Sequence, residues 1–220
     1  MPTDNKSIVY QYLQRLGFTL QKGIMEEAVK KMEKRGSYFQ LNFSHHFDEL
    51  SIFSAELFFW RDSVNPYYRL RQYEATLKYR NGQQEARSLI IHLPAFVGYG
   101  ITVKQTYNLL SGRPVFTEIY TDFGNVYSMW VKLTFCNYSK EGYVLRKCRL
   151  RNRVDLDELL KQLPIKNADT ERERAALISS IKDGDRVLLY LKGKDSYALE
   201  VVVDVIAETL TLQPRKIMSR

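Results

Sequence analysis

The sequence of 220 residues lacks the features that mark a membrane-spanning, secreted or disulfide-stabilised protein. It contains no run of about 18 apolar residues, which a membrane-spanning helix would need. Residues 1–6 show no basic start leading into an apolar stretch, so no signal peptide is expected. The two cysteines are Cys136 and Cys148, and a hairpin turning near 139–142 would not place them opposite each other. These absences predict a soluble, cytoplasmic protein without a disulfide.

The sequence also lacks a recognisable catalytic or metal-binding arrangement. Residues 122–124 spell the Asp-Phe-Gly tripeptide of protein kinases, but the kinase catalytic loop and intervening lobe are missing. His45, His46 and Asp48 can share a metal only in a turn, because neighbouring strand residues point to opposite faces. His92 has no nucleophile spaced to it, and neither cysteine has a nearby histidine or helix N-terminus to activate it. We therefore expect no enzyme activity, cofactor, metal or small-molecule substrate.

The apolar content, by contrast, is high enough for a folded core. Hydrophobic residues make up 45% of the chain and aromatic residues 13%, which is sufficient for one large core or two modest ones. Apolar spacing of helical period predicts helices over 4–16, 23–35, 102–110, 155–163 and 170–182. Strand-like runs occur at 37–44, 52–60, 67–80, 83–93, 127–135, 143–153, 186–191, 197–205 and 210–213, before a frayed tail at 215–220. Within 127–135, the odd-numbered residues are the expected core positions.

Short motifs predict how these elements begin, end and pair. The Asn-Gly dipeptide at 81–82 is favoured in a two-residue type I′ hairpin turn, which would place Lys78 opposite Glu85. Residues 102–105 and 155–158 have the spacing of capping boxes, in which two side chains satisfy free N–H groups at a helix N-terminus. Both helices are therefore expected to begin at these motifs.

A Leu-Leu-x-x-x-Pro-[Val/Ile] frame occurs twice, at 109–115 and 159–165. Each copy closes a short helix that follows a predicted β-hairpin; duplication and convergence on good helix endings both explain this. The repeated hairpin-plus-helix unit predicts an α+β fold, an antiparallel β-meander with helices packed on one face. The expected organisation is an N-terminal helical segment (1–36), a main α+β domain (37–165) and a small C-terminal unit of one helix and three strands (166–220).

Positive charge is concentrated in one segment of a chain whose formal net charge is +8. Residues 146–153 hold five cations and no acid. Alternate residues of this segment would project from one face of a strand at intervals of roughly 6.6 Å; these are Lys147, Arg149, Arg151 and Arg153, named here the basic strip. Neighbouring cations at this spacing repel each other by about 0.5–1 kcal/mol. Such repulsion favours a strip that is neutralised by a bound anion.

Three interpretations of the basic strip are open. A nucleic acid would neutralise it, with Arg69 and Arg71 as further cationic contacts and Tyr67 and Tyr68 as aromatic ones. An acidic protein partner would use the same charges. A solvated strand edge that resists aggregation would also carry lysine and arginine.

Several segments of the chain resemble a family of uncharacterised domains found in gut Gram-negative anaerobes, in proteins associated with conjugative and other mobile elements. The resembling segments are 12–18, 73–77, 101–115, 163–166 and 171–174, within a similarity that spans roughly residues 10–213. The most specific part is Thr-x-x-x-x-Tyr-Asn-Leu-Leu-x-Gly-Arg, which begins at Thr102. The resemblance implies a domain of unknown function in a mobile-element context, with no established catalytic residue. Family members tend to be more polar and aromatic where this chain has 146–153.

These observations predict a non-catalytic accessory or binding module that contacts nucleic acid or a nucleoprotein through basic residues. The alternative is a protein–protein interaction scaffold that binds through an exposed sheet edge or the apolar loop at 95–97.

Overall fold

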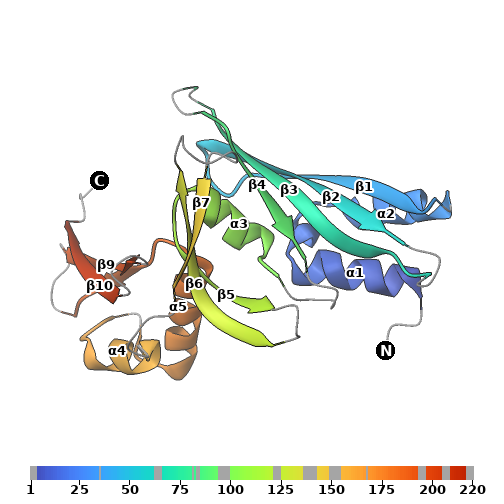
Figure 1. Ribbon diagram of the computed structural model, residues 1–220. Helices are drawn as coiled ribbons and strands as arrows, with labels where there is room; N and C mark the ends of the chain where they lie inside the picture. Colours follow the sequence, from blue (N-terminus) through green and yellow to red (C-terminus); the bar gives the residue numbers. More distant parts are fainter. Residues whose placement is uncertain are drawn as a thin grey trace. The chain divides into compact units, whose positions relative to one another are not determined.

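The computed structural model describes residues 4–34, 36–61, 66–80, 82, 85–93, 100–120, 125–135, 143–148, 155–166, 168–192, 197–204 and 209–216. The chain is a mixed α+β protein in which helices pack against antiparallel strands, as the sequence predicts (Figure 1). It divides into two compact units, Met1–Ser111 with Tyr120–Val126 and Gly112–Ile119 with Tyr127–Arg220. The expected domains 1–36, 37–165 and 166–220 stay a prediction.

Two helices open the first unit. α1 (Asn5–Arg15) begins after Asp4, whose side chain accepts a hydrogen bond from the Ser7 backbone N–H and so satisfies a free donor at the helix end. Gly17 follows α1 with φ +86°, a backbone conformation that favours glycine. A short 3-10 turn, η1 (Phe18–Leu20), then leads into α2 (Ile24–Glu33). Both predicted helices are confirmed.

The helices are followed by a four-stranded antiparallel meander of order β1-β2-β3-β4. Its strands are β1 (Tyr38–His45), β2 (Ser51–Trp60), β3 (Arg69–Tyr79) and β4 (Arg87–His92). Buried and more exposed residues alternate along them, because successive side chains point to opposite faces. The buried face contacts α1, α2 and α3 (Val103–Leu110), which lie on the same side of the sheet (Figure 1). The opposite face, with the less buried residues, is named here the open face.

The pairing of β3 with β4 differs from the predicted hairpin by one residue. Ala75 lies opposite Leu89, and both are buried. The predicted two-residue turn would put Ala75 opposite Ser88, and Lys78 opposite Glu85. Directly opposite residues share a face, so that register would bring a serine to the core and turn Leu89 outward. The predicted Lys78–Glu85 pair is wrong because the hydrophobic pattern of β4 decides the register.

Aromatic rings in edge-to-face contact fill the centre of the first unit. The ring of Phe18 lies 5.2 Å from the rings of Phe43 and Tyr73, at interplanar angles of 82° and 84°, a favourable arrangement for aromatic pairs. The Tyr73 hydroxyl donates to the Ile101 carbonyl at 2.6 Å and lies 2.6 Å from Thr106 Oγ1. These hydrogen bonds join β3 to the start of α3.

α3 begins with the predicted capping box. The Thr102 hydroxyl accepts a hydrogen bond from the Gln105 backbone N–H, and the Gln105 side chain accepts one from the Thr102 N–H. The Val103 N–H donates to the Leu16 carbonyl at 2.8 Å, which ties this end of α3 to the end of α1. The predicted start of the helix is confirmed.

The second unit contains two three-stranded sheets and two helices among its described residues. The first sheet has the order β5-β6-β7 and consists of β5 (Val115–Tyr120), β6 (Val126–Phe135) and β7 (Tyr143–Cys148). Two helices follow, α4 (Leu156–Gln162) and α5 (Glu171–Asp183). The second sheet has the order β10-β9-β8 and consists of β8 (Leu188–Tyr190), β9 (Tyr197–Asp204) and β10 (Thr209–Lys216). One buried cluster comprises Trp130, Leu156, Leu160, Ile165, Ala168, Ile181, Val187 and Leu189.

Three details of the second unit bear on the sequence predictions. Asp155 caps α4, accepting hydrogen bonds from two backbone N–H groups of the first turn, but the Glu158 side chain accepts from Lys161, so only the Asp155 half of the predicted capping box is present among the described contacts. In β6, Val131 is buried as predicted, but Tyr127 is 38% exposed and Trp130 is buried. Consecutive buried residues show that both faces of β6 are covered at this point, which a strict alternation does not predict. β10 extends to Lys216, so the predicted frayed tail is wrong for residues 215 and 216, and the rest of it lies outside the described residues.

No helix in the described ranges combines the length and apolar character that crossing a membrane requires.

Candidate functional site

Little of the basic strip falls within the described residues. Three of its four members, in the segment 149–153, lie outside them. Lys147 belongs to β7, where the register places it opposite Val131, which is buried. The preceding residue, Arg146, lies opposite Lys132. The strip therefore stays a prediction. Because Arg146 and Lys147 belong to different rows of the sheet, a test of the strip must change each of these residues separately.

Arg69 and Arg71 lie at the start of β3, beside a β-bulge. Trp60 pairs with Arg69, whereas Phe58 pairs with Gln72, and the register shift falls directly after Phe58. Arg71 is consequently the extra residue of the bulge, and it is exposed. Bulges bend a strand and change the direction of side chains. The bulge therefore gives this end of the sheet one more exposed cation than a regular strand would.

The two tyrosines before β3 have different environments. Tyr68 is buried, its ring lies 4.8 Å from that of Phe39, and its hydroxyl donates to the Gly36 carbonyl. The Arg61 guanidinium lies over the same ring at 5.2 Å, a cation–π distance. Tyr67, by contrast, is 36% exposed. Tyr68 thus belongs to the core, and Tyr67 keeps the surface position that a binding residue needs.

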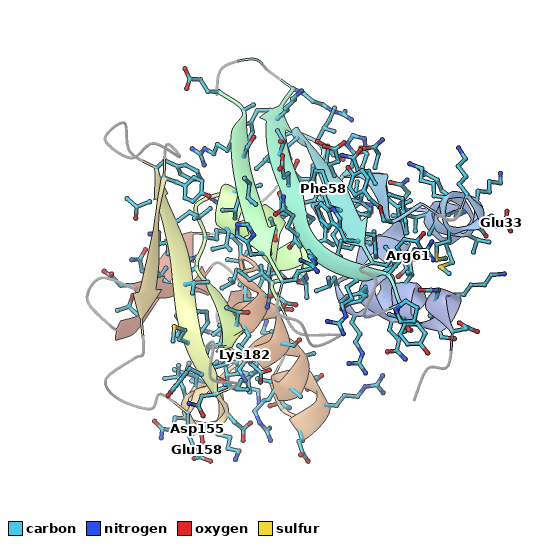
Figure 2. All side chains as sticks on the ribbon, turned by 45° about the vertical axis from the view of Figure 1, so that its right-hand side comes forward. Glu33, Phe58, Arg61, Asp155, Glu158 and Lys182 are labelled. Carbon is cyan, nitrogen blue, oxygen red and sulfur yellow. The ribbon has the colours of Figure 1, made fainter. Side chains whose placement is uncertain are left out.

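Three aromatic side chains meet on the open face where β1 begins and β2 ends. Tyr38 pairs with Trp60 across the two strands, with ring centroids 5.2 Å apart and planes tilted by 41°. Phe58, on the same face of β2, stacks on Trp60 at 5.7 Å with an interplanar angle of 18°. Tyr38 is 40% exposed, and the other two rings are partly exposed. Figure 2 marks Phe58 on the sheet and Arg61 beyond the end of β2. We name Tyr38, Phe58 and Trp60 the aromatic patch.

A polar row crosses the sheet beside the aromatic patch. Gln40 lies opposite Phe58, which lies opposite Gln72, which in turn lies opposite His92. Directly opposite residues share a face, so two amides and an imidazole flank Phe58 on the open face. His92 is exposed, and both glutamines are partly exposed. We name Gln40, Gln72 and His92 the polar row; it offers hydrogen-bond donors and acceptors next to a ring.

Two carboxylates oppose each other in the next row of the open face. Glu56 of β2 lies directly opposite Glu74 of β3, and like charges in this position destabilise a sheet. Both line a hollow of about 510 Å³ whose wall also includes Gln21, Ser44 and Thr76. The open face is therefore acidic at its middle, while Arg69 and Arg71 lie towards its aromatic end.

The edge of β1 is occupied by side chains from the helical segment. Gln21 Nε2 donates to the Asn42 carbonyl at 3.1 Å, and Gln21 Oε1 accepts from the Ser44 N–H at 2.7 Å. Further along the edge, Lys31 Nζ donates to the Gln40 carbonyl at 2.5 Å. These contacts satisfy backbone groups that an added strand would need.

The histidines considered as metal ligands have other contacts. The His45 ring lies 4.6 Å from that of Phe47, whereas His46 Nδ1 lies 3.2 Å from the Ser51 carbonyl oxygen. Asp48 accepts hydrogen bonds from the Ser51 backbone and hydroxyl and from the Tyr107 hydroxyl. Within the described ranges, no group of three or more His, Cys, Asp or Glu side chains is arranged to hold a metal.

Sequence reasoning did not single out the aromatic patch. Residues 52–60 form one apolar run, and its last three are all aromatic, so the sequence does not show which of them face outward. The signal that reveals the patch is the cross-strand pairing of Tyr38 with Trp60, which depends on the register.

Neither the known protein-family models nor the curated proteins nor the solved structures include a match to this chain.

Proposed function

We propose that the chain is a non-catalytic accessory or binding module of a mobile-element system, acting in the cytoplasm, and that it contacts nucleic acid. The mobile-element setting rests on the resemblance described for segments such as 101–115. The proposed contacts are Lys147, Arg149, Arg151, Arg153, Arg69 and Arg71. The observation that carries the proposal is the position of Arg69 and Arg71 at the bulge of β3, beside partly exposed rings of the open face. Cations next to aromatic faces are the combination with which proteins hold nucleic-acid strands.

The charge of the chain supports this proposal. A net charge of +8 attracts polyanions at long range. Each side chain that neutralises a phosphate releases condensed counterions, so the affinity of a multi-contact complex falls steeply with salt. Salt dependence thus distinguishes phosphate contacts from apolar ones.

Fluorescence anisotropy of labelled single-stranded and duplex DNA, measured over a salt series, tests the proposal. Triple charge reversal of Lys147, Arg149 and Arg151 to Glu is expected to weaken binding strongly. The matched control reverses Lys22, Lys30 and Lys34, which are exposed on or next to α2, and so changes the net charge equally. Equal losses of DNA affinity in both variants would contradict the proposed site. Absence of DNA binding by the unaltered chain would contradict the proposed function.

Single reversals refine the position of the strip. The β7 register assigns position 147 to the row of Val131 and position 146 to the row of Lys132. The proposed strip requires Lys147→Glu to weaken DNA binding more than Arg146→Glu does. If Arg146→Glu weakens DNA binding more than Lys147→Glu does, the contact is assigned to the other face of β7. Folding of both variants is checked by thermal unfolding, since a strand charge reversal can also destabilise the sheet.

A protein-interaction scaffold is the second candidate, and exposed apolar residues of the open face favour it. The partly exposed rings of Tyr38, Phe58 and Trp60 adjoin one another, and contiguous exposed apolar surface often marks an interface. The edge of β1 suits such a role less well, because Gln21 and Lys31 occupy it. The loop at 95–97 lies outside the described residues. Absence of salt-dependent DNA binding in the anisotropy series would leave this candidate in place.

A further inference from the structure

We propose that the aromatic patch is a stacking platform for the bases of single-stranded nucleic acid. This inference rests on the proposed function and extends it, because it names a contact surface in the first unit and the strand form that it binds. Bases in a duplex stack on each other, and their faces are inaccessible to a protein ring. Bases of a single strand are free to stack on aromatic side chains.

The geometry of the rings suits stacking. Phe58 and Trp60 are nearly parallel, 18° apart with centroids separated by 5.7 Å, and the ring of Tyr38 lies 5.2 Å from Trp60 across the strands. The three rings come from neighbouring positions of β1 and β2, so the sheet backbone holds their order. A rigid row of partly exposed rings accepts successive bases with little loss of side-chain freedom.

The polar row supplies hydrogen-bonding groups at the right place. Gln40 and Gln72 flank Phe58 on either side, and His92 follows on β4. A base that stacks on Phe58 presents its edges to these amides, which both donate and accept hydrogen bonds. The combination of a ring and flanking amides fits a nucleobase better than a purely apolar partner surface.

The distribution of charge orients the strand. Arg69 lies opposite Trp60, and Arg71 follows at the bulge. On the other side of the polar row, Glu56 and Glu74 repel phosphates. The sugar–phosphate backbone is therefore expected at the arginine end of the sheet, with the bases directed over the aromatic patch.

A basic peptide is the competing occupant, since arginine and lysine also bind aromatic faces and carboxylates. The two occupants respond in opposite ways to the acidic pair. Replacing Glu56 and Glu74 with Gln removes repulsion from a phosphate backbone, whereas it removes the partners of a basic peptide. The net charge of +8 and the arginines beside the rings favour the nucleic acid.

The test measures binding of the full chain to labelled oligothymidylate and oligouridylate of about 12 nucleotides and to a duplex of equal length. Trp60→Leu and Phe58→Leu retain apolar bulk but remove the ring. Each is expected to lower single-strand affinity about five- to 150-fold, with little effect on duplex binding. Trp60→Phe, which keeps a ring, is expected to restore most of the affinity. Ile52→Ala, on the same face of β2, is the matched control and is expected to have no effect.

Intrinsic fluorescence gives a readout that does not depend on a variant. The chain has two tryptophans, and Trp130 is only 4% exposed. Base stacking on Trp60 is expected to quench emission with the single strands but not with the duplex. The Glu56→Gln and Glu74→Gln variant is expected to bind the oligonucleotides at least as well as the unaltered chain.

The outcomes separate this inference from the proposed function. If the unaltered chain binds no nucleic acid, the stacking platform and the proposed function are both overturned. Binding that the basic-strip reversal abolishes, but that Trp60→Leu and Phe58→Leu leave unchanged, overturns the platform alone. A third outcome also overturns the platform. If replacement of the two glutamates weakens oligonucleotide binding, and an arginine-rich peptide binds only when the glutamates are present, the aromatic patch is assigned to a peptide.

Discussion

Gln21 accepts a 2.7 Å hydrogen bond from the Ser44 N–H and, through the other end of its amide, donates one to the Asn42 carbonyl. These are two of the contacts that a neighbouring strand would make with the edge of β1. The side chain of Gln21, the residue directly after η1, thus takes the place of one residue of an added strand. Edge strands with free backbone groups invite pairing with other chains, and Gln21 blocks this edge at its middle.

Gln21→Ala is expected to expose the edge of β1 and to lower the free energy of unfolding by about 1 kcal/mol. The variant should self-associate at concentrations where the unaltered chain does not, which sedimentation velocity over a concentration series measures. Gln14→Ala is the control, because Gln14 is exposed on α1. Equal sedimentation of both variants would show that the amide does not protect the edge.

Two buried tyrosines are expected to respond oppositely to loss of the hydroxyl. Tyr73 makes two 2.6 Å contacts through its hydroxyl, so Tyr73→Phe should cost about 1–3 kcal/mol of unfolding free energy. The Tyr12 hydroxyl is buried without a hydrogen-bond partner among the described residues, so Tyr12→Phe should leave stability unchanged or raise it by about 1 kcal/mol. Urea unfolding of the two variants measures both effects. A comparable loss in each would contradict the hydrogen-bond assignment.

Burial raises the pKa of Tyr73, and this gives the same residue a signature in alkaline solution. A folded-state pKa above the unfolded value of about 10 means that the stabilisation is complete below that pH. It is then lost as the pH rises towards the folded-state pKa. The difference in stability between the unaltered chain and Tyr73→Phe should therefore shrink above about pH 10. A constant difference would contradict a neutral, hydrogen-bonded hydroxyl.

Asp48 is expected to make stability depend on acid pH. Its burial opposes ionisation, but hydrogen bonds from Tyr107, Ser51 and Leu50 outweigh this and lower its pKa. A lowered pKa contributes stability above the unfolded value of about 4, and this contribution is lost as the pH falls through the folded-state value. Asp48→Asn should be less stable at neutral pH, with the deficit narrowing below about pH 4. Glu49→Gln, at an exposed neighbour, is the control in thermal melts across pH.

Local signals in the sequence are sufficient for the boundaries of α1 and the start of α3, whereas β5 is not among the predicted strands. Asp4, Gly17 and the Thr102–Gln105 capping box act within a few residues of the chain, so their effects are visible without knowledge of the fold. The alternation of apolar residues likewise predicted the antiparallel meander with one covered face.

Features that depend on pairing between distant segments were not predictable in this way. The β3–β4 register follows from the need to bury Leu89 opposite Ala75, and this outweighs the turn preference of Asn-Gly. The aromatic patch exists because Tyr38 meets Trp60, residues far apart in the chain. Gln21 contacts Ser44, a residue 23 positions away in the chain. The basic strip needs no such pairing and stays a sequence prediction.

The most direct test of the account is the slope of log affinity against log salt for single-stranded DNA. Phosphate contacts contribute about −0.7 each for a single strand, so the six proposed cationic contacts predict a slope of about −4 for the unaltered chain. The reversal of Lys147, Arg149 and Arg151 should flatten it, while the equally charged reversal of Lys22, Lys30 and Lys34 should leave it nearly unchanged. A flat slope, or the same flattening in both variants, would contradict nucleic-acid binding through these residues.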